Sequence, residues 1–225
     1  ADHFAAAMRD MWNRWCSSVS AYANPDSNPS PGHSSTKARY TPPTIDTRIN
    51  APAKPLLKLH IGGKQAKAGW KILNAQAIDG VDYIGDVRDL SVFEDGCCET
   101  IYASHVMEHV PQKDFLRTLQ GIHRILCDKG EFHFSVPDLE TLCQLFLDPK
   151  LDKPQRFHVM RMMFGGQQDE FDFHFIGLTN EFMLDFFKQA GFSSARRVQS
   201  FGLFDDTSDF SPYGSPISLN MIATK

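Results

Sequence analysis

Two histidines and a glutamate stand close together in the stretch "SHVMEHV", which spans residues 104–110. His105 and His109 are four residues apart, and Glu108 directly precedes the second histidine. Two imidazoles at this spacing on one face of a helix could share a metal ion, and the glutamate could then act as a general base on a bound water. The stretch could therefore serve metal chemistry, another reaction, or only the fold.

The metal interpretation meets three objections. The H-x-x-E-H pattern occurs in one group of zinc peptidases, but an apolar strand-like stretch, residues 100–104, runs straight into His105. Pro111 follows two residues after His109, and proline is disfavoured in the interior of a helix. No local signal marks a third ligand. We therefore expect no metal ion here, and two alternatives stay open: a zinc hydrolase using His105, Glu108 and His109, and a purely structural role for both histidines.

Composition narrows the class of protein. The chain has 225 residues, of which 42% are hydrophobic and 22% charged, as in ordinary globular proteins. A net charge of −4 argues against a nucleic acid as the main partner, and no apolar run is long enough to predict a membrane span. The five cysteines include no C-x-x-C pair. We therefore expect no disulfide framework, no cysteine zinc site and a cytoplasmic location.

The chain divides into three parts. Residues 1–22 have apolar side chains at helical spacing, which predicts an amphipathic helix. Residues 23–55 are rich in proline and serine and poor in large apolar groups, which indicates a linker or extended arm. Residues 56–225 have the pattern of a globular domain.

Strands and helices alternate along this third part. Strand patterns occur at residues 56–62, 70–74, 82–86, 100–104, 131–137, 195–201 and 217–225. Helix patterns occur at about 115–126, 138–146, 155–164 and 179–191, and Asp138 and Thr179 are placed to cap two of them. The alternation predicts an α/β sheet of parallel character. Only about eight and about seven residues join the first three strands, whereas a parallel crossover usually needs about 10–12. Either those crossover helices have shrunk to single turns or the topology differs.

Four stretches, in this order, carry a resemblance to a known family. They are "LKLHIGGKQAKAGWKILN", "DYIGDVRDLSVFEDGCCETIYASHVMEHV", "LQGIHRILCDKGEFHFSVPDLETL" and "FGGQQDEFDFHF" with the later "LTNEFMLDFFKQAGF". From Leu56 onward the chain resembles a compact class I S-adenosylmethionine-dependent methyltransferase of the type 11 group. The resemblance implies a Rossmann-like sheet of seven strands, mostly parallel with the last antiparallel, here with shortened first crossovers.

The resemblance also implies a cofactor site at the ends of the strands. Seven residues would hold S-adenosylmethionine: Gly62, Gly63, Asn74, Asp86, Val87, Ser104 and His105. The glycines would let the backbone approach the methionine part. Asp86 and the backbone of Val87 would meet the adenine, and Ser104 and His105 would flank the sulfonium.

One position departs from the family pattern. Asn74 stands where the family carries the carboxylate that binds the ribose hydroxyls. An amide can still hydrogen-bond to hydroxyls, but it lacks the charge-assisted bonds, which are about twice as strong. Asp79 could supply the carboxylate from the next loop. A second reading of the function follows, in which the chain is a catalytically degenerate binding or regulatory module.

The acceptor is the least determined part. By fold-level analogy it is a small molecule or a glycan, with a hydroxyl oxygen favoured over nitrogen or carbon as the methylated atom. His105 and His174 are the candidate catalytic residues, because histidine titrates in the range useful for moving a proton. The segment 156–175 is rich in Met and Phe. It could cover the acceptor or, with the helix at residues 1–22, form a homodimer contact.

Overall fold

The computed structural model of the protein describes residues 55–225. The expected helix at residues 1–22 and the arm up to residue 54 lie outside the described residues. Residues 56–225 form one compact unit. No helix within the described part is both long and apolar enough to cross a lipid bilayer.

The core of this unit is a seven-stranded sheet in the order β3-β2-β1-β4-β5-β7-β6. The strands are β1 (Leu57–Ile61), β2 (Trp70–Asn74), β3 (Tyr83–Ile84), β4 (Cys98–Ser104), β5 (Leu126–Pro137), β6 (Ser194–Arg197) and β7 (Ser218–Thr224). The first five strands run parallel, and β7 is antiparallel to both of its neighbours. The predicted sheet, including its antiparallel last strand, is confirmed.

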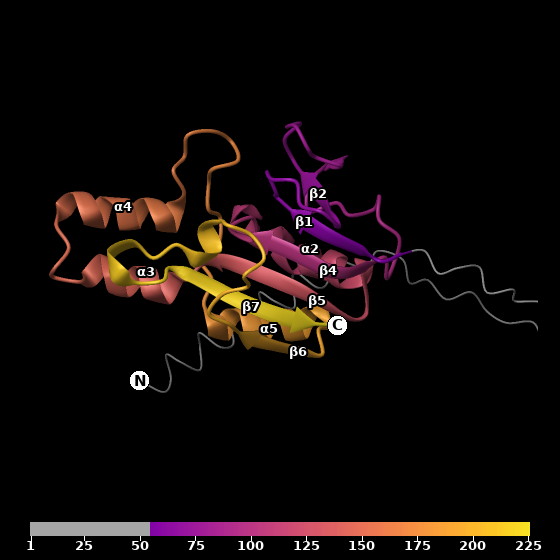
Figure 1. The fold of residues 1–225 in the computed structure, drawn as a ribbon. Helices are drawn as coiled ribbons and strands as arrows, with labels where there is room; N and C mark the ends of the chain where they lie inside the picture. The colour runs from indigo at the N-terminus through magenta and orange to yellow at the C-terminus, as the bar shows by residue number, and fades with distance from the viewer. Residues whose placement is uncertain (1–54) are drawn as a thin grey trace, which may run out of the picture. The chain divides into compact units, whose positions relative to one another are not determined.

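The longer helices are α2 (Gln112–Ile125), α3 (Leu139–Leu147), α4 (Lys153–Phe164) and α5 (Asn180–Ala190), and short 3₁₀ turns are η1 (Met107–His109), η2 (Thr207–Asp209) and η3 (Pro212–Gly214). α2 and α5 pack on one another and on the same side of the sheet (Figure 1). Phe132 and Phe134 of β5 meet Phe187 of α5 edge to face there, which accounts for their complete burial.

The first two crossovers contain no helix. Residues 62–69 and 75–82 are turns and bends, yet β1 still pairs in parallel with β2, and β2 with β3. The short connections predicted either shrunken crossovers or a different topology, and the first alternative is correct. The backbone N–H of Gly62 donates to the Leu73 carbonyl at 2.7 Å, so the ladder continues past the end of β1.

The opposite face of β1 and β4 is covered by the connection between β6 and β7, residues 198–217. Phe204 packs against His60 and Tyr102, with ring centroids 4.1 and 4.9 Å apart, respectively. The Tyr102 hydroxyl donates to Asp206 at 2.8 Å. Aromatic packing and this polar contact thus attach a long loop, which includes η2 and η3, to this face of the sheet.

The end of β5 is fixed by Asp138. Its side chain accepts a hydrogen bond from the Glu140 backbone N–H, which caps α3 as the sequence predicts, and it also accepts one from Arg197 at 2.7 Å. Thr179 caps α5 as expected, and Gly191 ends that helix in a left-handed conformation. Asp138 therefore joins β5, α3 and β6.

His60 makes stability depend on pH. Burial lowers the pKa of His60 from 6.5 to about 4, the Asp206 charge opposes this shift and the Lys67 charge adds to it. Its Nδ1 atom is buried and has no hydrogen-bond partner within residues 55–225. Because the unfolded chain binds a proton at this histidine more readily, stability is full above about pH 6.5 and falls as the pH drops toward about 4, by up to about 3 kcal/mol.

The measurement is urea unfolding at several pH values between neutrality and about pH 4 for the wild type and His60→Phe. We expect the variant to lose less stability over this range, since phenylalanine keeps the aromatic contact and cannot be protonated. Equal pH dependence in both proteins would contradict the assignment to His60.

Candidate functional site

A cavity of about 610 Å³ opens at the carboxyl ends of the parallel strands. In open α/β sheets this is the edge where ligands bind. Its wall comes from the ends of β1, β2 and β4, from the loop after β3, and from residues 168–172 with Phe175. Of the seven predicted cofactor residues, five line it: Gly62, Asn74, Asp86, Val87 and His105. Gly63 and Ser104 lie beside it and are absent from its lining.

The turn after β1 is held by close packing. Gly62 has φ +76°, and a Cβ atom there would lie 2.3 Å from Cγ2 of Val106. A Cβ atom on Gly63 would lie 2.6 Å from Nδ1 of His60. Both positions thus require glycine for steric reasons, and only Gly62 reaches the cavity.

The Asn74 side chain forms hydrogen bonds with two backbone groups. It is buried, its Nδ2 donates to the Gly63 carbonyl at 2.9 Å, and its Oδ1 accepts from the Gln76 N–H at 2.9 Å. The amide ties the end of β2 to the glycine turn. A carboxylate could not make the first of these bonds, which gives a physical reason for asparagine here. Asp79, the expected substitute carboxylate, is exposed and does not line the cavity.

Asp86 presents a carboxylate at the cavity wall. Arg88 donates to it through Nε, Nη2 and its backbone N–H, at 2.5 to 3.0 Å. These bonds hold the pKa of Asp86 below its usual range against the opposing effect of partial burial. Val87 is buried beside it. The wall therefore combines a fixed negative charge with an apolar side chain.

The end of β4 brings His105 to the cavity. His105 has φ 51°, outside the 3₁₀ turn Met107–His109, so it does not share a helix face with His109. Its Nε2 lies 2.9 Å from the Ser218 hydroxyl and its Nδ1 lies 3.2 Å from Oε1 of Glu108. Ser104 instead donates to Asp206 at 3.2 Å. The paired helical histidines required by the zinc peptidase pattern are therefore not formed.

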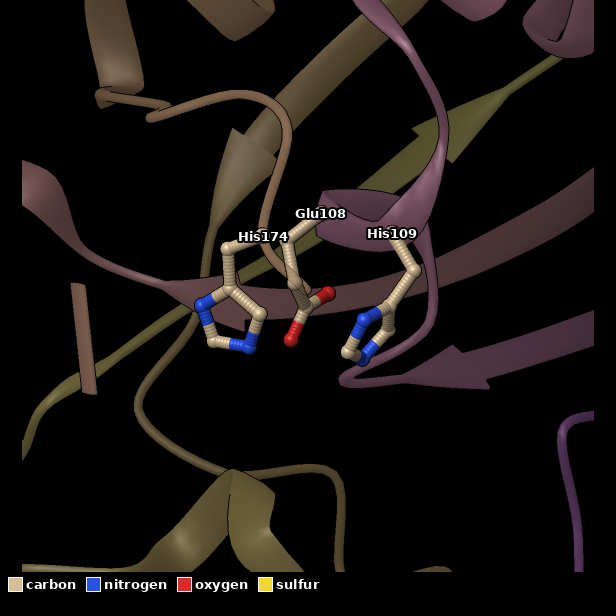
Figure 2. Close-up of side chains that lie close together, drawn as sticks. All are labelled: Glu108, His109 and His174. Atoms are coloured by element: carbon tan, nitrogen blue, oxygen red, sulfur yellow. The ribbon is translucent and has the colours of Figure 1, made fainter. Parts of the chain in front are cut away.

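His174 comes from a distant part of the chain to the same turn. Its ring centroid lies 4.9 Å from that of His109, and the Glu108 side chain lies between the two rings (Figure 2). Burial lowers the pKa of His174, with further lowering by His109 and His105 and an opposing effect of Glu108. His174 does not itself line the cavity, whereas His109 does. We call Glu108, His109 and His174 the His–Glu cluster.

The segment after α4 forms one side of the cavity. Phe171 and Phe175 line it and remain about half exposed, at 46% and 48%. The sequence left two alternatives for this aromatic segment, a cover over the acceptor or a homodimer contact, and it did not indicate Lys64, Gln76 and Arg88 as part of the wall. Arg88 could have been found as the cation two residues after Asp86. Lys64 and Gln76 carry no such signal.

Comparison with known proteins finds a family match for the first half of this domain. Residues 54–134 match a family model described as "Methyltransferase domain". This match spans β1 to β4 and most of β5, and so includes every strand end that lines the cavity. No curated protein matches the chain.

Several solved structures share this fold at low sequence identity. A Thermotoga maritima SAM-dependent methyltransferase, described as a possible histamine N-methyltransferase, is 18% identical, covers 76% of this chain and 83% of its own, and has a TM-score of 0.49. A Burkholderia thailandensis 1,6-didemethyltoxoflavin-N1-methyltransferase, with S-adenosylhomocysteine bound, is 14% identical over 76% of this chain and 72% of its own, with a TM-score of 0.48. An Archaeoglobus fulgidus SAM-dependent methyltransferase is 13% identical over 76% and 86%, with a TM-score of 0.46.

Two glycines with similar backbone conformations test the packing of the turn. Gly69 has φ +81°, and a Cβ atom there would have nothing within 4 Å, whereas a Cβ atom on Gly62 would meet Val106. We expect Gly69→Ala to cost about 1–2 kcal/mol from backbone strain alone, and Gly62→Ala to cost about 1–3 kcal/mol more from overpacking.

The measurement is urea unfolding of both variants, of Val106→Ala and of Gly62→Ala with Val106→Ala. The double variant should recover most of the extra loss, since removing the valine methyls makes room for the new Cβ. Simple additivity of Gly62→Ala and Val106→Ala would contradict the contact.

Proposed function

We propose that this chain is an S-adenosylmethionine-dependent methyltransferase that methylates a hydroxyl oxygen of a small molecule or glycan. The match of residues 54–134 to the methyltransferase-domain model supports the reaction class. The observation that carries the cofactor site is the meeting of the Gly62 turn, Asp86 and His105 around one cavity. When bound, the cofactor supplies an activated methyl group. The chain must hold it, orient the acceptor and receive a proton.

The cavity fits the cofactor in size and lining. Ligand cavities usually measure about 300–1,000 Å³ and combine apolar walls with a few placed polar groups. Leu73 and Val87 give apolar surface, and the Asp86 carboxylate can accept a hydrogen bond from an adenine amino group. The Gly62 turn brings backbone to the wall without a side chain in the way.

Three of the predicted cofactor residues act indirectly in this proposal. Asn74 and Gly63 share a hydrogen bond that fixes the glycine turn. Ser104 bonds to Asp206 and so anchors the end of β4 to the loop that covers the sheet. We assign these three residues to positioning, and we assign contact with the cofactor to Gly62, Asp86, Val87 and His105.

The acceptor is proposed to enter between the end of β4 and the segment 168–175. Phe171 and Phe175 provide apolar surface there, and His109 lines the same side. Of the two histidines predicted to be catalytic, His105 has both ring nitrogens in contact with protein groups, so we assign it to the cofactor side and to orienting Glu108. His174 acts on the acceptor side through the His–Glu cluster. Hydroxyl acceptors are favoured because this cluster could assist removal of their proton.

A homodimer through residues 156–175 is part of the same proposal. Phe157 and Phe164, in or at the end of α4, are 60% and 55% exposed, which is unusual for large apolar side chains. The helix expected at residues 1–22, the other half of the proposed contact, lies outside the described residues.

The cofactor site is tested by isothermal titration of the full chain with S-adenosylhomocysteine. We expect a single site, and we expect Asp86→Ala to weaken binding by about 5–150-fold, which corresponds to about 1–3 kcal/mol for a lost hydrogen bond to a charged group. The matched control is Asp89→Ala, because Asp89 is an exposed carboxylate in the same loop that does not line the cavity.

Two outcomes count against the proposal. Absence of binding by the wild type at millimolar S-adenosylhomocysteine would favour the degenerate binding module. Equal affinities of Asp86→Ala and Asp89→Ala would remove Asp86 from the site while leaving the cofactor itself in place.

A further inference from the structure

We propose that Glu108, His109 and His174 bind a divalent transition-metal ion at the edge of the cavity. One ligand atom from each residue lies within 4.8 Å of the others, and Figure 2 shows the carboxylate between the two imidazole rings. This spacing suits a shared ion, since the ligand atoms of a metal bound at about 2.0–2.2 Å stand roughly 3–4 Å apart and only small side-chain movements are needed.

The Glu108 carboxylate supports this site independently. Its side chain is only 2% exposed, and among the described residues neither oxygen has a hydrogen bond of good geometry. Oε1 has the ion-pair contact with His105 at 3.2 Å, and Oε2 has no partner there. Burial of a carboxylate oxygen that has no partner is unfavourable. A cation bound between Oε2 and the two histidines would supply the missing compensation.

His109 is held in the tautomer that a metal ligand needs. Its Nδ1 lies 3.1 Å from the Phe173 carbonyl oxygen. Because a carbonyl can only accept, Nδ1 carries the hydrogen and Nε2 is left with a free lone pair. A histidine that binds a metal commonly donates its second N–H to a carbonyl or carboxylate in this way.

His174 is fixed against the turn by its neighbours. The Phe175 N–H donates to the Glu108 carbonyl at 2.8 Å, and the Phe173 carbonyl accepts from His109. The residues on both sides of His174 are thus bonded to the two other members of the cluster. The fold therefore supplies the third ligand that the sequence pattern lacked.

The donor set determines the class of ion. Two imidazole nitrogens and one carboxylate suit Zn²⁺, Co²⁺, Mn²⁺ or Fe²⁺, whereas Mg²⁺ and Ca²⁺ prefer oxygen ligands throughout. Three protein ligands leave at least one coordination position of the ion open. Because His109 lines the cavity, the ion would lie at the cavity wall. A bound ion would act as a Lewis acid that lowers the pKa of a coordinated hydroxyl. This last use rests on the proposed function, whereas binding of the ion does not.

The test is a titration of the chelator-treated full chain with Co²⁺, followed by visible absorption and by calorimetry. We expect stoichiometric binding with ligand-field bands, and we expect Zn²⁺ to displace the Co²⁺. His174→Ala should weaken Co²⁺ binding by at least about 10–100-fold. Mutation of residues that only hydrogen-bond to metal ligands already lowers metal affinity by this factor. The matched control is His158→Ala, since His158 is an exposed histidine of α4 whose recorded contact is with Tyr213.

Folding of each variant is checked by thermal melting in the presence of chelator. Glu108→Gln provides a second variant of nearly equal size, and it should lose Co²⁺ affinity while removing the buried charge. Wild-type affinity in both His174→Ala and Glu108→Gln, or a loss equal to that of His158→Ala, would overturn the inference. Titration of the same samples with S-adenosylhomocysteine distinguishes the two proposals. The protein can bind S-adenosylhomocysteine without a metal site, and it can bind the metal ion without a cofactor site.

Discussion

The parallel pairing of β1 with β2 on one side and with β4 on the other is the constraint on which the site depends. Parallel strands end at the same edge, so the turns that follow them meet although they are far apart in sequence. Gly62 and His105 follow two paired strands, and Asp86 follows β3 at the end of the same row. Hydrogen bonding in the ladder, and not contact among the site residues, brings them to one cavity.

The chain maintains this edge without crossover helices between its first three strands. Residues 198–217 lie on the face of β1 and β4 opposite α2 and α5, and aromatic contacts of Phe204 with His60 and Tyr102 hold them there. Asp206 accepts hydrogen bonds from Tyr102 and Ser104, so the same loop also steadies the end of β4. One loop thus covers the sheet and supports the site.

Much of the fold could be predicted because its signals are local. Residues 70–74 were predicted as a strand with the observed limits, and Asp138 and Thr179 cap the helices they were expected to cap. The site was harder because its contacts are not local. Nothing in the sequence shows that the Asn74 amide donates to the Gly63 carbonyl and accepts from the Gln76 N–H.

The position of His174 was also not predictable from the sequence, because its contacts are with residues far away along the chain. The H-x-x-E-H pattern suggested His105 and His109 as a pair, but the positive φ of His105 turns it toward Glu108 and Ser218. The partner of His109 lies 65 residues further along the chain, and backbone hydrogen bonds of Phe173 and Phe175 put it there. A spacing rule cannot anticipate such a contact, because it depends on how two loops cross in the finished fold.

The most direct test of the cofactor site is a crystal structure of the protein with S-adenosylhomocysteine. We expect the adenine beside Asp86 and Val87, the homocysteine against the Gly62 turn, and the sulfur on the side of His105. A ligand bound elsewhere, or a cavity at these strand ends that stays closed to it, would contradict the assignment of this edge of the sheet to the cofactor.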